Sequence, residues 1–196
     1  MKKIFAIMTL ISILIVTFLI AQSNYSIPKG WFAAGSNPSE YEMRMDNSQY
    51  QNGSSSASLK SKSPKENQFG TLMQTISADN YLEKRLQLSG YVKSENVKGW
   101  SGIWMRIDGG KNKQLGFDNM KDRAIKGTTD WTKYEIVLDV PSNSKAISYG
   151  VLLGGEGKVW FDNFKLEEVE KNVPRTNLMK EKQLPSQPIN LDFEEN

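Results

Sequence analysis

Apolar and polar residues alternate along most of the chain between residues 41 and 169, in short segments separated by Gly, Asn, Asp, Ser and Pro. Such alternation places successive side chains on opposite faces of a β-strand, whereas a helix needs a repeat of about 3.6 residues. The pattern therefore predicts a series of short strands joined by turns. We expect them at residues 41–46, 57–62, 69–76, 84–94, 100–107, 114–119, 132–140, 146–153 and 158–169.

Only the segment 78–84 has the pattern of a helical turn. Parallel strands need a crossover connection of a dozen or more residues, usually a helix. This segment is too short for that purpose, so we expect antiparallel sheets and an all-β sandwich or barrel.

The first 23 residues differ from the rest. Lys2 and Lys3 precede an almost wholly apolar, uncharged run of 18 residues from Ile4 to Ala21. Ala21-Gln22-Ser23 then offers the small-x-small pattern of a signal-peptide cleavage site. Cleavage after Ser23 is the first interpretation; an uncleaved anchor is the alternative, because the run would span roughly 27 Å as a helix. Either way we expect a protein that is secreted or anchored to the outer face of the cytoplasmic membrane, since the lysines stay inside.

The domain organisation follows from where the alternation stops. Residues 24–170 are expected to form one β-sandwich domain. Residues 171–196 are expected to form a flexible polar tail, because 172–190 contain three prolines and no aromatic residue. The last residues, 190–195, are apolar enough to dock, and such a segment often opens a following β-domain.

Charge and missing residue types exclude several functions. Without Lys2 and Lys3, 23 basic residues face 22 acidic ones, so no nucleic-acid footprint is expected. The chain has no His and no Cys, which excludes disulfides, Ser-His and Cys-His nucleophile pairs and His-based zinc sites. We expect the protein to contact a membrane only through its N-terminal segment.

Three stretches carry a resemblance to a known group: LSGYVKSE at 88–95, DWTKYEIVLDVP at 130–141 and GKVWFDNFKL at 157–166. In that order they resemble the central and final strands of the galactose-binding-like jelly rolls, which include the CenC-type carbohydrate-binding modules of bacterial exported proteins. The resemblance covers roughly residues 30–169. It implies an antiparallel two-sheet jelly-roll β-sandwich and a module that binds a glycan without catalysis.

One predicted strand offers a binding face. Alternation in 100–108 sends Ile103, Met105 and Ile107 to the core, and Trp100, Trp104 and Arg106 to the opposite face. In jelly rolls of this type that face is often the concave one. A sugar stacks its C–H face on aromatic rings, and its hydroxyls need fixed donors and acceptors. The predicted ligand-binding residues are Trp104, Arg106, Tyr91 and Gln74, with Asn119 and Arg123 on a loop at the rim.

Each of these residues also has a purely structural interpretation. Trp104 and Tyr91 could cover the sandwich beneath a loop, and Arg106 could pair with Asp118 or Glu135. Trp131 and Trp160 are interpreted as packing residues.

Acidic residues raise two further questions, hydrolysis and calcium binding. Paired carboxylates can hydrolyse a glycoside. Four of the candidates, Asp108, Asp118, Asp122 and Asp130, lie in or beside predicted turns, where Asp is favoured for local hydrogen bonds. The resemblance implies a structural Ca²⁺ site in which Asp162 would be one ligand. Its partner ligands are not matched in 41–46, so an Asp162 without metal is favoured, and no other cofactor is expected. The carboxylates considered for hydrolysis are Asp108, Asp118, Asp122, Asp130 and Glu135.

The leading hypothesis is therefore a non-catalytic, exported carbohydrate-binding module with its ligand on a concave sheet face. The alternative is an extracytoplasmic protein-interaction or sensory module without a small-molecule ligand. The two differ in whether Trp104 lines an open groove or lies on a filled, flat face. Neither the sugar nor the oligomeric state follows from the sequence.

Overall fold

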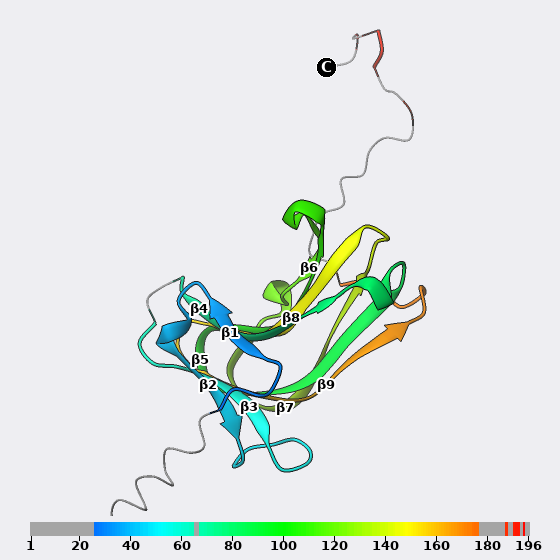
Figure 1. Ribbon diagram of the computed structural model, residues 1–196. Helices are drawn as coiled ribbons and strands as arrows, with labels where there is room; N and C mark the ends of the chain where they lie inside the picture. The colour runs from blue at the N-terminus through cyan, green and yellow to red at the C-terminus, as the bar shows by residue number, and fades with distance from the viewer. Residues whose placement is uncertain (1–25, 65–66, 177–186, 188–189, 193, 195–196) are drawn as a thin grey trace, which may run out of the picture.

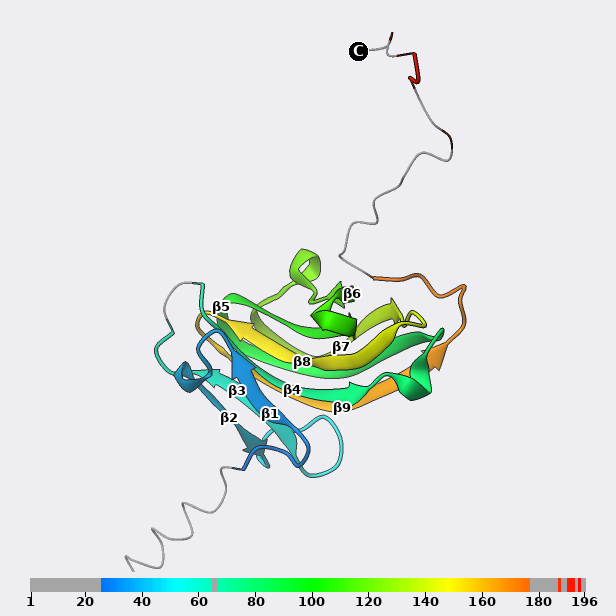
Figure 2. The ribbon, with the colours of Figure 1, turned by 45° about the horizontal axis from the view of Figure 1, so that its top comes forward.

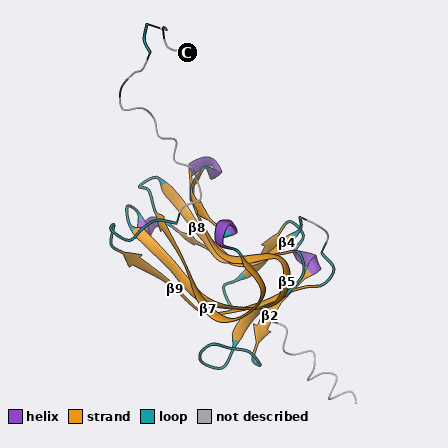
Figure 3. Cartoon of the chain, turned by 180° about the vertical axis from the view of Figure 1, so that it is seen from behind, coloured by secondary structure: helices purple, strands orange, loops and turns teal. Residues whose placement is uncertain are grey.

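The computed structural model of the protein describes residues 26–64, 67–176, 187, 190–192 and 194 (Figure 1). Within these residues the chain is all-β, with short 3-10 turns and no α-helix (Figure 3). The predicted signal peptide or anchor at 1–23 lies outside the described residues. The strands are β1 (Phe32–Gly35), β2 (Tyr41–Asp46), β3 (Ser56–Ser61), β4 (Phe69–Ser77), β5 (Arg85–Gly109), β6 (Gln114–Asp118), β7 (Ile125–Asp139), β8 (Ser144–Gly154) and β9 (Lys158–Val169).

The long strand β5 belongs to both layers of the fold (Figure 2). Its first half pairs with β7 and β9, and its second half pairs with β8 and β6. One layer therefore has the order β2-β3-β9-β5-β7 and the other β1-β4-β8-β5-β6. All these pairs are antiparallel, as the missing crossover helices predict.

The two segments predicted at 84–94 and 100–107 are one strand of 25 residues. Its pairing with β7 slips in register between Val92 and Ser94, between Ser94 and Val97, and between Val97 and Ser101. Extra residues at such bulges bend a strand and increase its twist. The Asn, Lys and Gly residues at 96–99 predicted a turn, but they lie in this bend.

The structure adds one strand and lengthens another. The strand β1 was not predicted, because Phe-Ala-Ala-Gly has little β-propensity as a segment; it forms by pairing with β4, with Phe32 opposite Met73. β7 begins at Ile125, earlier than the predicted residue 132. The predicted helical turn at 78–84 is a 3-10 turn, η2 (Asp79–Tyr81).

The core lies between the two layers, and β5 contributes to both sides of it. Ile103, Met105 and Ile107 are fully buried, as the alternation predicts. Leu86 and Leu88 from the first half of β5 are also fully buried. Each such side chain stabilises the fold by about 1.5–3 kcal/mol through removal of apolar surface from water.

An aromatic cluster extends the core. The ring of Trp31 lies 6.0 Å from that of Tyr149, 6.0 Å from that of Phe161 and 5.9 Å from that of Phe164. Gly90 on β5 makes room for this cluster, because a Cβ there would lie 2.0 Å from the Phe164 ring. The cluster ties the segment before β1 to β8 and β9.

Residues 171–176 lie against β7. Thr176 N–H donates to the carbonyl of Val137 at 2.9 Å, and Val137 N–H donates to Thr176 Oγ1 at 2.9 Å. Arg85 donates to the carbonyl of Val173 at 2.6 Å and pairs with Asp139 at 2.8 Å. Of the predicted tail, most residues beyond 176 lie outside the described part. No helix among the described residues is long and apolar enough to cross a membrane.

Candidate functional site

A cleft of about 930 Å³ lies over the outer face of the β1-β4-β8-β5-β6 layer. Residues from all five strands line it, together with the loop before β4 and the turn after β8. Because neighbouring strands lie about 4.8 Å apart, a cleft that crosses five strands is about 19 Å long. This length suits an extended ligand of several units.

Trp104 lines the cleft but is only 7% exposed. Its indole N–H donates to Thr71 Oγ1 at 2.8 Å, and the Thr71 hydroxyl donates to the carbonyl of Val151 at 2.7 Å. Gly150 on β8 is the residue opposite Trp104 in the pairing. The side chain therefore forms part of the cleft floor, and its polar atom is already used.

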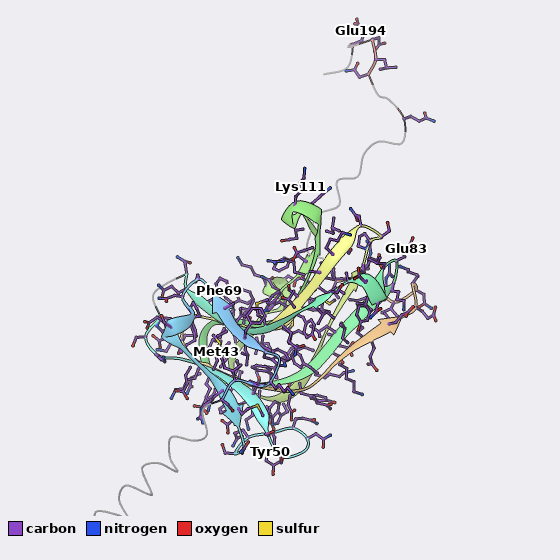
Figure 4. The ribbon with its side chains drawn as sticks, in the orientation of Figure 1. Met43, Tyr50, Phe69, Glu83, Lys111 and Glu194 are labelled. Carbon is purple, nitrogen blue, oxygen red and sulfur yellow. The ribbon has the colours of Figure 1, made fainter. Side chains whose placement is uncertain are left out.

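Three other aromatic rings line the cleft. Trp100 and Phe117 are half-buried, and Phe69 is 38% exposed at the start of β4 (Figure 4). Trp100 extends over Gly154, where a Cβ would lie 3.2 Å from its Nε1. The alternation placed Trp100 on this face without assigning it to the site, whereas no sequence signal identified Phe69 or Phe117.

Polar residues gather where β5 and β6 meet the cleft. Arg106 lines it and donates from Nε to Asp108 Oδ2 at 2.8 Å. The structural interpretation of Arg106 predicted a pair with Asp118 or Glu135. Arg106 pairs with Asp108 instead, because residues two apart on one strand share a face. Asn119 also lines the cleft, and its Oδ1 accepts the N–H of Lys121 at 3.2 Å.

At the opposite rim Lys98, on β5, and Glu156, in the turn after β8, form an ion pair of 2.5 Å. The loop before β4 completes this rim with Asn67 and Gln68. The site thus combines aromatic surfaces with donors and acceptors of both charges.

Three predicted residues lie away from the cleft. Gln74 faces the interior, where its Oε1 accepts the Tyr149 hydroxyl at 2.5 Å. Tyr91 is on the first half of β5, opposite Lys133 of β7 and Asp162 of β9, and so belongs to the other layer. The bend in β5 separates Tyr91 from Trp104, a change of layer that strand alternation alone does not reveal.

Arg123 forms a structural ion pair. Its Nη2 lies 2.7 Å from Asp118 Oδ2, and Asp118 is fully buried. Burial by itself lowers the pKa of Arg123, but the hydrogen bonds and charge of Asp118 outweigh it and raise this pKa above its ordinary value. Asp118 also accepts the Met120 N–H at 2.7 Å, so this pair fixes the turn after β6.

Asp162 does not fit a calcium ligand. Its Oδ2 accepts the N–H groups of Gln51 and Asn52, each at 3.0 Å, and its Oδ1 accepts that of Asn163 at 2.7 Å. These three donors direct their hydrogens at the carboxylate, where a cation would have to bind. Within the described residues no group of three or more acidic side chains could hold a metal ion.

The arrangement of carboxylates does not resemble that of a glycosidase. Of the described residues that line the cleft, Glu156 is the single acidic one. Hydrolysis needs two carboxyl groups on either side of the scissile bond. Asp118 is buried against Arg123, and Asp130 is an exposed residue of β7 that accepts the Trp131 N–H at 2.8 Å.

No protein-family model matches the chain. The chain is 46% identical over 168 residues to a Bacillus subtilis (strain 168) protein named as the uncharacterized HTH-type transcriptional regulator YbfP. That match covers 85% of this chain but only 57% of the relative's length.

Solved structures share the fold at low identity. One is the CBM22-1 xylan-binding domain of Paenibacillus barcinonensis Xyn10C, with a TM-score of 0.54 and 15% identity over 74% of this chain and 89% of that one. Another is the enzymatically active domain of tailspike protein 4 of bacteriophage CBA120, with a TM-score of 0.56 and 14% identity over 72% of this chain and 20% of that one. The predicted all-β fold is confirmed for the described residues: the chain shares its jelly-roll fold with solved carbohydrate-binding modules.

Proposed function

We propose that this protein is a non-catalytic glycan-binding module whose ligand occupies the cleft on the β1-β4-β8-β5-β6 layer. The observation that carries the proposal is a cleft of about 930 Å³ lined by Trp100, Phe69 and Phe117 together with charged and amide side chains. Its volume lies within the range of about 300–1,000 Å³ typical of ligand sites.

The chemistry of the lining suits a sugar chain. Pyranose rings present apolar C–H faces that pack on aromatic rings, and their hydroxyls need donors and acceptors held in place. Trp100 and Phe69 supply partly exposed rings, and Asn119 supplies an amide. Trp104 supports the floor beneath the ligand, since its ring is nearly buried.

The test is a glycan array followed by titration of the purified full-length protein. Changing Trp100 to Ala should weaken binding of any glycan by about tenfold or more, because one stacking surface is lost. The matched control is Trp131→Ala on β7, a half-buried tryptophan that does not line the cleft. Equal losses in both variants, or no glycan bound by the parent protein, would overturn the proposal.

We also propose that the module acts outside the cytoplasm, because residues 1–23 have the pattern of a signal peptide or anchor. Fractionation of cells that produce the protein, with mass determination of its N-terminus, tests this. A mature chain that begins at Asn24 supports cleavage, and a full-length membrane-bound chain supports anchoring. A full-length chain in the cytoplasm contradicts both.

A second candidate function is an extracytoplasmic sensory or protein-interaction module. The relative of 46% identity favours the sensory role alone, because its name describes a transcriptional regulator and gives no place outside the cytoplasm. In that case the cleft would hold no glycan, and the array would show no saturable binding. Cross-linking in cells that produce the protein would then recover a specific protein partner, lost when the cleft residue Phe69 is changed to Ala.

A further inference from the structure

We propose that the cleft selects an acidic glycan, a chain whose rings carry carboxylate groups, and that the carboxylate binds at the β5–β6 end. This inference rests on the proposed function and specifies its ligand. The observation behind it is the uneven placement of charge among the described residues that line the cleft. Lys98, Arg106 and Lys121 are cationic there, and Glu156 is the single carboxylate.

The two ends of the cleft differ in how these charges are balanced. At one rim Lys98 and Glu156 lie 2.5 Å apart and neutralise each other. At the other end Arg106 and Lys121 both line the cleft, and Asp108 is the acidic partner of Arg106. Of the described residues, neither Asp108 nor Asp122, which follows Lys121 in the chain, lines the cleft, so Arg106 and Lys121 are the charged side chains that face a ligand here.

Arg106 is oriented to receive an anion. Its ion pair with Asp108 is made through Nε, at 2.8 Å, and its side chain is 42% exposed, against 16% for Asp108. A guanidinium has five N–H donors in a fixed fork, so this bond orients the group while the Nη atoms keep further donors. A planar carboxylate is the partner that such a fork fits.

The neighbouring side chains suit the same ligand. Phe117, which pairs directly with Arg106 across β5 and β6, offers a ring beside the cation. Asn119 lines the same end, and its amide N–H₂ group is a donor to oxygen. A sugar ring that packs on Phe117 would thus carry its carboxylate toward Arg106.

The test uses glycans with and without a charged carboxyl group on the same backbone. The full-length protein is titrated with polygalacturonate and its methyl ester, with glucuronoxylan and its carboxyl-reduced form, and with neutral xylan. We expect each acidic member to bind about tenfold more tightly than its neutral counterpart, because a charge-assisted hydrogen bond is lost in the latter. This preference should shrink as salt screens the charges.

Variants assign the preference to the proposed residues. Arg106→Gln should remove most of the difference in affinity between acid and ester, and Lys121→Gln should remove a smaller part of it. Because the Lys121 side chain is exposed, its replacement should not unfold the protein. Lys165→Gln, which removes the same charge from an exposed residue of β9, should leave the preference unchanged.

The outcomes separate this inference from the proposed function. Equal binding of acid and neutral counterpart, or a preference that survives both cleft variants, overturns the acidic ligand and leaves glycan binding intact. No binding to either member of any pair also overturns it, and the glycan array then decides the proposed function independently.

Discussion

Trp104 and Thr71 are joined across strand β8 by a hydrogen bond of 2.8 Å from the indole N–H to Oγ1. Thr71 in turn donates to the backbone of β8, at the carbonyl of Val151. The bond thus links three strands beneath the cleft. Because this N–H is already used, a ligand cannot accept a hydrogen bond from the Trp104 indole. Selectivity for a ligand must then come from the residues at the rim of the cleft.

Changing Thr71 to Val should destabilise the fold by about 1–3 kcal/mol, because a buried indole N–H then has no acceptor. Urea unfolding followed by tryptophan emission measures this. The control is Thr75→Val on the same strand, which removes a part-buried hydrogen bond to the Ser148 hydroxyl at 2.9 Å and leaves no indole N–H without an acceptor. If both variants lose the same stability, the buried bond has no special role.

Changing Arg123 to Gln should lower the free energy of unfolding by about 3 kcal/mol, since the fully buried Asp118 carboxylate loses its cation. The double variant with Asp118→Asn should recover part of this loss, because a neutral amide can still accept the Met120 N–H. Asp122→Asn, which breaks only the exposed pair to Arg123, is the control. Additive losses in the double variant would contradict a coupled pair.

Asp46 should make the stability of the protein depend on acid pH. Burial by itself raises the pKa of Asp46, but hydrogen bonds from Ser48 and Trp160 outweigh it and hold this pKa well below its ordinary value of 3.8. Lys158 adds a further bond at 3.3 Å. The folded state therefore keeps the carboxylate at a pH where the unfolded chain takes up a proton.

The stability that Asp46 contributes is present above pH 3.8 and is lost as the pH falls through the lower folded-state pKa. In urea unfolding between about pH 4 and pH 2, Asp46→Asn should show a smaller decline than the parent, by up to about 1.4 kcal/mol per pH unit. Asp130→Asn, at an exposed position within β7, serves as the control for removal of one carboxylate. An unchanged decline in Asp46→Asn would contradict this role.

Calcium should not stabilise the protein, because the Asp162 carboxylate already accepts three backbone N–H groups. Thermal unfolding with chelator and with millimolar Ca²⁺ should give the same midpoint. Asp162→Ala should lower stability by about 1–3 kcal/mol through release of the loop between β2 and β3. A midpoint that rises with Ca²⁺ and does so only when Asp162 is present would restore the metal site.

The cleft shows where sequence reasoning succeeded and where it did not. Alternation correctly placed Ile103 in the core and Trp104 and Arg106 on the opposite face, because a strand's side chains alternate whatever the strand pairs with. It could not exclude Tyr91, whose layer depends on the bend in β5. Phe69 was missed because an aromatic residue at a strand end gives no sign of which surface it lines.

By itself the sequence determined the all-β class, the positions of most strands and the absence of chemistry that needs His or Cys, since these depend on residue types and local periodicity. Tertiary structure decided that β5 serves both layers, that Gln74 and Arg123 make internal bonds, and that a cleft exists. Those features depend on which distant strands pair and where bulges bend them. Such long-range choices leave no periodic trace in one chain.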